Sequence, residues 1–182
     1  MQVIGQMYEE FKLAHNKQIN IVVATSGDTG SAAISALKNR ENIKYDEELY
    51  RLLNNGHPSY IYTNAVLTHA IDILERKNLR DLMKGIYYRN SNVEYMKPNI
   101  MGYRIVEEDV LYKENVSIFD PVEIYFFDDL PINLKTAKRI GWKTVLINPI
   151  SNEKDYIDYH YTNIKEALKD MKKKKDICLE IV

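Results

Sequence analysis

Ile124-Tyr125-Phe126-Phe127-Asp128-Asp129 decides the fold, because it is an apolar run that ends in two adjacent carboxylates. A short apolar run of this kind predicts a buried strand. Residues 132–140 follow with helical spacing, Gly141 is a natural helix stop, and residues 144–147 form another apolar run. A strand, a helix and a strand joined by short links predict a parallel pair with a helical crossover.

The same alternation extends through the preceding residues. Strands are expected at residues 19–24, 60–62 and 86–88, and helices at residues 3–14, 31–38, 46–54 and 66–77. Alternating strands and helices are typical of an α/β protein. The sequence therefore predicts a single doubly wound, Rossmann-like parallel sheet with helices on both faces.

Length and composition favour one soluble domain covering residues 1–182. The chain has 45% hydrophobic residues and a formal net charge of -1, which argues against nucleic acid or an anionic membrane as a partner. The basic run at residues 172–175 is expected to be a solvated face near a helix end. The single cysteine, Cys178, excludes internal disulfides and favours a reducing compartment such as the cytoplasm. The sequence makes no prediction about the oligomeric state.

Ligand sites in such folds gather where strands end. Thr25, Thr63 and Asp128 all fall at the carboxyl ends of expected strands. Adjacent acids after a strand, here Asp128 and Asp129, suit a hard cation such as Mg²⁺ that keeps positions for water and phosphate. The alternative is that this pair only starts a turn and caps the next helix.

Residues 45–171 resemble the pyrimidine 5'-nucleotidase-like branch of the haloacid dehalogenase superfamily. The shared motifs are Thr63-Asn64-Ala65, His69, Met96-Lys97-Pro98, Asp128-Asp129, and the helix positions Asn133, Ala137 and Gly141. The resemblance implies a core without a large cap. It also implies that Thr63, Asn64 and Lys97 bind phosphate, that Lys97 acts in catalysis, and that Asp128 and Asp129 bind Mg²⁺.

Each motif residue also has an ordinary structural explanation. Thr63 would serve as a helix cap, Lys97 as a solvated charge before a turn, and His69 as a packed or surface histidine. The order and spacing of the motifs favour the functional interpretation, because phosphoryl transfer needs positioned donors, a cation and charge neutralisation.

The chain departs from that family at the first catalytic motif. The family uses Asp-x-Asp-x-Thr/Val, and no Asp-x-Asp occurs in this sequence. Aligning Thr29 with the motif threonine places Thr25 and Gly27 at the carboxylate positions, and Asp28 would act from an off-register position. Neither Thr25 nor Gly27 provides a carboxylate nucleophile.

Residues 1–41 resemble a segment of threonine synthase. The core of the match is Ala24-Thr25-Ser26-Gly27-Asp28-Thr29-Gly30-Ser31-Ala32-Ala33, a loop that leads into a helix. In that family the loop receives a substrate carboxylate beside pyridoxal phosphate, and amides at a helix start suit an anion. The family's Schiff-base lysine has no counterpart here, so pyridoxal phosphate is not expected.

Together the two resemblances predict that residues 19–24 replace the family's first strand, between residues 60–62 and 124–127. The expected activity is an impaired magnesium-dependent phosphomonoester hydrolase, nucleotidase-like, acting on a small phosphorylated molecule. The assigned residues are Asp28 and Lys97 for catalysis, Thr63, Asn64, Lys97, Thr25 and Ser26 for phosphate, and Asp128 and Asp129 for metal. The alternatives are a noncatalytic phosphate- or metabolite-binding pseudoenzyme and a fusion product derived from threonine synthase.

Overall fold

The structure is a computed structural model that describes residues 17–22, 46–54, 56–89, 96–117, 119–150 and 154–179. Its strands are β1 (Lys17–Val22), β2 (Ser59–Tyr62), β3 (Met83–Tyr87), β4 (Val122–Asp128), β5 (Lys143–Ile147) and β6 (Tyr159–Tyr161). They form one six-stranded sheet in the order β3-β2-β1-β4-β5-β6, and every neighbouring pair is parallel.

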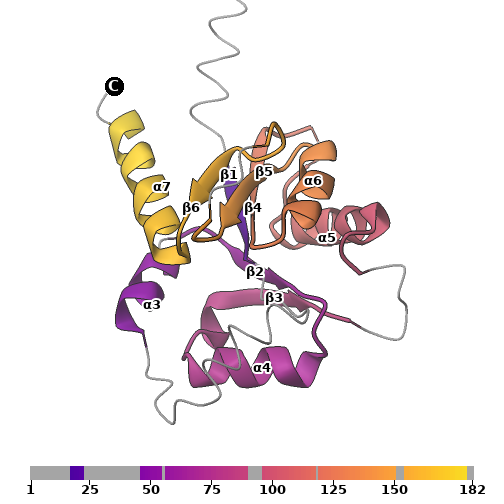
Figure 1. The fold of residues 1–182 in the computed structure, drawn as a ribbon, viewed down its shortest axis with the longest axis horizontal. Helices are drawn as coiled ribbons and strands as arrows, with labels where there is room; N and C mark the ends of the chain where they lie inside the picture. The colour runs from indigo at the N-terminus through magenta and orange to yellow at the C-terminus, as the bar shows by residue number, and fades with distance from the viewer. Residues whose placement is uncertain are drawn as a thin grey trace, which may run out of the picture.

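Helices cover both faces of this sheet (Figure 1). They are α3 (Glu47–Leu53), α4 (Leu67–Arg76), α5 (Ile100–Lys113), α6 (Pro131–Arg139) and α7 (Ile164–Leu179), with a short 3₁₀ helix, η1 (Arg80–Leu82). α5 and α6 lie on one face, and α3, α4 and α7 lie on the other. The predicted doubly wound α/β architecture is confirmed.

β1 occupies the centre, where the strand order reverses. Val22 pairs with Ile61 of β2 on one side and with Phe127 of β4 on the other. The expected position of this strand, between β2 and β4, is therefore confirmed. Doubly wound sheets form their crevice at such a switch point, beyond the carboxyl ends of the strands.

Alternating side chains divide the core between the two faces. Phe126 and Tyr62 pack toward α5 and α6, whereas Phe127 and Ile61 pack toward the other helices. This division follows from the two-residue period of a strand. A strand that is buried on both faces must be apolar along its length, which explains the run at residues 124–127.

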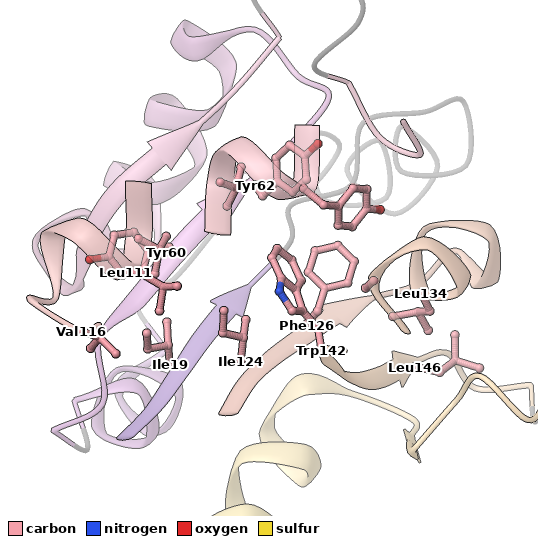
Figure 2. Packing of buried hydrophobic residues seen from close by; sticks show 14 residues of the cluster. Ile19, Tyr60, Tyr62, Leu111, Val116, Ile124, Phe126, Leu134, Trp142 and Leu146 are labelled. Atoms are coloured by element: carbon pink, nitrogen blue, oxygen red, sulfur yellow. The ribbon is translucent and has the colours of Figure 1, made fainter. Parts of the chain in front are cut away.

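The face covered by α5 and α6 is aromatic. Figure 2 shows Phe126 and Trp142 near the middle of this cluster, and their ring centroids lie 5.5 Å apart. Tyr103 of α5 packs edge-on against Tyr62, with centroids 5.3 Å apart. Such edge-to-face pairs add to the stabilisation from burial itself. They fix α5 against β2 and β4.

Gly141 ends α6 as the sequence predicted. Its φ of +95° is accessible to glycine at low cost, and its N–H donates to Lys138 O at 3.0 Å. The strand expected at residues 86–88 begins earlier, at Met83, and leaves Tyr88 outside. Ladder pairing with β2 sets this boundary, which the short apolar run does not reveal.

Four elements have no counterpart among the predicted strands and helices, namely α5, α7, β6 and the 3₁₀ helix η1. A signal for α5 was present, because Asn99 caps it by accepting from Met101 N at 3.0 Å. The basic run at residues 172–175 lies within α7, which continues to Leu179, rather than at the helix end. The helices expected at residues 3–14 and 31–38 lie outside the described residues.

None of the described helices combines the length and the apolar character that crossing a bilayer requires.

Candidate functional site

The candidate site lies at the carboxyl edge of the sheet, on both sides of β1. Thr63 directly follows β2, and Asp128 is the last residue of β4. Lys97 lies just before α5 and reaches Asp128 from a different part of the chain. The fold thus brings Lys97 to Asp128, and it brings Asn64, the neighbour of Thr63, to the backbone of Lys97.

A buried ion pair is the centre of the site. Lys97 Nζ donates to Asp128 Oδ2 at 3.0 Å, and the two side chains are only 2% and 0% exposed. The alternative explanation of Lys97 as a solvated charge before a turn is therefore wrong. The pKa of the Lys97 ammonium is lowered overall. Burial lowers this pKa, and the negative charge of Asp128 raises it by a smaller amount. The rings of Tyr62 and Phe126 face Nζ at 5.5 and 5.7 Å.

Asp128 is fully engaged by protein donors. Its Oδ2 also accepts from Asn133 Nδ2 at 2.9 Å, and its Oδ1 accepts from Leu130 N at 2.8 Å. The alternative that the acid pair starts a turn is therefore correct for Asp128. The expected cap of the next helix is not formed, because the N-cap residue of α6 is Leu130 and has no side-chain cap. These bonds compensate the cost of burying the carboxylate and fix its orientation.

The backbone around Lys97 is clamped from two sides. Asn64 Nδ2 donates to Lys97 O at 2.9 Å, and Lys97 N donates to Asn64 Oδ1 at 3.0 Å. Thr136 of α6 donates its hydroxyl to Pro98 O at 3.0 Å. These contacts connect the ends of β2 and β4 to the start of α5. Asn64 thus positions Lys97, and its assignment to phosphate stays a prediction.

Thr63 is buried and has a local role in the turn after β2. Its Oγ1 accepts from Ala65 N at 3.0 Å, and its own N–H donates to Tyr87 O at 2.8 Å. Thr63 is not a helix cap, because α4 begins after Val66 without a side-chain cap. His69 lies partly buried in the first turn of α4.

Asp129 differs from its neighbour Asp128 in having an unsatisfied oxygen. Its Oδ1 is buried and accepts no hydrogen bond from a described residue. Burial first, and then the negative charge of Asp128, raise the pKa of Asp129 to about 6. A buried acceptor without a donor is unfavourable by about 1–3 kcal/mol, and it marks a place where a cation or a donor would be stabilising.

The donor set fits Mg²⁺ held together with a phosphate. Among the residues that the structure describes, no three His, Cys, Asp or Glu side chains converge as a complete metal cage. Mg²⁺ does not need such a cage, since it commonly binds one or two carboxylates and completes its shell with water and phosphate oxygens. Asp129 would supply the unsatisfied oxygen, with Asp128 beside it.

The remaining assigned residues, Thr25, Ser26 and Asp28, lie outside the described residues. Sequence analysis also missed one supporting contact of the site: the Tyr103 hydroxyl donates to Asn133 O at 3.0 Å. Asn133 in turn holds Asp128, so α5 stabilises the acid through α6. A capping asparagine followed by helical spacing at residues 103, 106 and 110 would have revealed α5.

Comparison with solved structures identifies the fold as haloacid dehalogenase-like. An L-2-haloacid dehalogenase aligns with a TM-score of 0.60 and 11% identity over 86% of this chain and 99% of its own. The L-2-haloacid dehalogenase of Xanthobacter autotrophicus aligns with a TM-score of 0.53 and 13% identity over 69% of this chain and 60% of its own. At such identities the similarity establishes the fold alone.

A haloacid dehalogenase-type hydrolase of Bacillus subtilis, described as bound to magnesium, aligns with a TM-score of 0.53 and 17% identity over 79% of this chain and 70% of its own. No protein-family profile matches the chain.

Curated relatives match only a short amino-terminal stretch. Threonine synthase-like 2 of Xenopus laevis is 46% identical over 43 residues, which are 24% of this chain and 9% of that protein. Threonine synthase of Corynebacterium glutamicum is 48% identical over 44 residues, again 9% of its length. The predicted threonine synthase-like segment is confirmed as a fragment that spans about a tenth of these relatives.

Proposed function

We propose that this protein binds a phosphomonoester together with Mg²⁺ and hydrolyses it slowly. The observation that supports this most directly is the unsatisfied Asp129 oxygen beside the buried Lys97–Asp128 pair. The site lies at the crevice where ligands bind in sheets of this topology.

Charge explains why phosphate binding should require the cation. Lys97 contributes one positive charge, and Asp128 and Asp129 contribute two negative charges, so the described site is negative overall. A phosphate dianion would be repelled by this arrangement, whereas a divalent cation makes the total positive. When bound, Mg²⁺ would also withdraw charge from the phosphoryl oxygens.

The chain's own residues would position the phosphoryl group. Lys97 carries three N–H donors and uses one on Asp128, which holds the ammonium in a fixed direction. Asn64 and Asn133 hold Lys97 and Asp128 in turn. Such a preorganised cation stabilises charge that develops on the transferring group. Thr63 adds a hydroxyl at the end of β2.

Weak turnover follows from the first-strand sequence. The residues after Val22 are Val23-Ala24-Thr25-Ser26, and none of them is a carboxylate. Attack by an aspartate, with transfer of the phosphoryl group to it, is therefore not available at this position. Asp28 is the nearest acid in that loop and is the proposed substitute. The same absence favours a second candidate, a pseudoenzyme that binds without turnover.

Thermal unfolding with and without Mg²⁺ and inorganic phosphate tests the binding proposal. Phosphate at 100 times its Kd should stabilise the protein by about 2.7 kcal/mol, and only when Mg²⁺ is present. Asp129→Asn should abolish the stabilisation by Mg²⁺, because it removes the charge of the carboxylate that has an unsatisfied oxygen. Equal stabilisation by phosphate in EDTA would contradict the charge argument and sink the proposal.

Phosphate release separates the two candidates. With p-nitrophenyl phosphate and Mg²⁺ we expect turnover near 0.01 s⁻¹, about 10³-fold below the median enzyme. Asp28→Asn should remove this activity. Binding without any release would favour the pseudoenzyme. Release from uridine 5'-monophosphate would support the nucleotidase-like assignment.

A further inference from the structure

We propose that the organic group of the bound phosphomonoester is aromatic or otherwise apolar and rests on an apolar collar around the site. The collar consists of Val66, Tyr88, Met101 and Ile132. This inference rests on the proposed function, since it concerns the part of the substrate that projects from the phosphate.

Two members of the collar lie in the first turns of helices that begin at the site. Ile132 follows Asp129 by three residues and is the second residue of α6. Met101 follows Lys97 by four residues and is the second residue of α5. Each side chain is 55% exposed, although most of α5 and α6 packs on the sheet.

The other two members follow neighbouring strands. Val66 comes three residues after Thr63, immediately before α4. Tyr88 comes directly after Tyr87, whose carbonyl accepts from Thr63 N at 2.8 Å. Because this bond joins the ends of β2 and β3, Tyr88 lies beside the turn that carries Thr63. Val66 and Tyr88 are 42% and 43% exposed.

Single exposed apolar side chains are common on protein surfaces and need no explanation. These four differ because each lies within four residues of a site residue or of a strand end that is bonded to one. The large apolar side chains Tyr112 and Phe119 are more exposed, at 85% and 90%, but they belong to the opposite end of α5 and the loop after it. They provide an internal comparison.

Charge around the collar also favours an apolar group. In the described connections 63–66, 88–89, 96–99 and 128–131, Arg89 is the only charged side chain that is exposed rather than buried or partly buried. Lys97 and Asp128 are buried against each other. An aromatic ring would cover apolar surface here and pair with the ring of Tyr88.

Two phosphonates that resist hydrolysis test the collar. Phenylphosphonate and methylphosphonate share one head group and differ in the apolar part, so the ratio of their Kd values reports the collar. In Mg²⁺, isothermal titration should give about tenfold tighter binding of phenylphosphonate, the ratio expected when about 60 Å² of ring surface leaves water. Tyr88→Ser combined with Ile132→Ser should reduce this ratio to about one.

Tyr112→Ser is the matched control, because it removes a similar ring from the far end of α5 and should leave the tenfold ratio intact. If neither phosphonate binds in Mg²⁺, the proposed function itself fails. If both bind with equal Kd values, or if Tyr112→Ser lowers the ratio as much as the collar variants, phosphate binding stands and the collar proposal is overturned.

Discussion

Two of the ion-pair groups that join distant parts of this chain differ mainly in their exposure to solvent. Lys97 and Asp128 meet at 3.0 Å with almost no exposure. On the surface, Lys165 of α7 meets Asp46 at 3.0 Å and Glu48 at 3.3 Å, with about a third or more of the side chains exposed. Similar distances therefore occur in very different dielectric environments.

The difference indicates what each group contributes. Exposed pairs are worth about 0–1 kcal/mol, so Lys165 helps to hold α3 against α7 without determining the fold. Burying two charges costs several kcal/mol that their attraction only partly returns. A buried pair at the carboxyl edge is thus poor evidence for stability, and its orientation by Asn64 and Asn133 fits a role in binding.

The largest effect is expected from Lys97→Met. It leaves the Asp128 carboxylate buried without its counter-charge, which should lower the free energy of unfolding by about 3–5 kcal/mol. Lys165→Met, the matched surface variant, should lower it far less, because exposed ion pairs are screened by solvent. Urea unfolding measures both. Equal losses would erase the distinction between the two groups.

Combining Lys97→Met with Asp128→Asn should recover about 2 kcal/mol relative to Lys97→Met alone, because the unpaired buried charge is then gone. The amide still offers an acceptor for Leu130 N. A double-mutant cycle in urea measures the coupling. Simple additivity of the two losses would show that the charges do not interact.

Asp129→Asn should stabilise the metal-free protein by about 1 kcal/mol at pH 8. The raised pKa of Asp129 alone would give a larger value, but solvent screens the charge of this partly exposed group. The folded-state pKa near 6 lies above the ordinary value of 3.8, so wild-type stability falls as pH rises through this interval. The benefit of the variant should therefore disappear below about pH 4. Melting in EDTA across pH 4–8 tests this, and a constant difference would contradict it.

The smallest effect concerns the start of α3. Asp46→Ala should cost about 1 kcal/mol, because Asp46 accepts from Leu49 N at 3.0 Å as the helix cap. Asp46→Asn keeps a cap and removes only the charge facing Lys165, so its loss should be smaller.

Acid should weaken the contribution of Asp46. The hydrogen bond from Leu49 N–H, and then the one from Lys165, lower the pKa of Asp46. The ionised Asp46 therefore adds to the free energy of unfolding at pH values above its ordinary pKa of 3.8, and this stabilisation is lost as the pH falls below that value. Unfolding at pH 7 and pH 3 checks both the size and the sign. A larger difference between wild type and Asp46→Asn at pH 3 would be the wrong sign.

Local pattern was sufficient for much of the fold. The apolar run at residues 124–127 and the helix ended by Gly141 were predictable, because strand and helix periods are visible in neighbouring residues. The central place of β1 was predicted from the resemblance to the family's first strand and not from periodicity. α5 was missed although its signal was present in the sequence, namely the capping Asn99 followed by helical spacing at residues 103, 106 and 110. Packing of Tyr103 against Tyr62 made that face evident.

The candidate site, like the fold, was predictable from the sequence only in part. The residue types Thr63, Lys97 and Asp128 and their order along the chain were visible in the sequence. The burial of Lys97 and the hold of Asn64 on its backbone depend on contacts between segments more than thirty residues apart. Among the described residues, the unsatisfied oxygen of Asp129 likewise became evident only in the folded structure.

By itself, the sequence determined the alternation of strands and helices, the acids after β4 and the absence of an Asp-x-Asp motif, since each is a property of residues close together in the chain. Tertiary structure alone decided which charge is buried and which acid keeps an unsatisfied oxygen. Burial and pairing arise when crossovers bring remote segments to one edge of the sheet, and the pKa values follow from that arrangement.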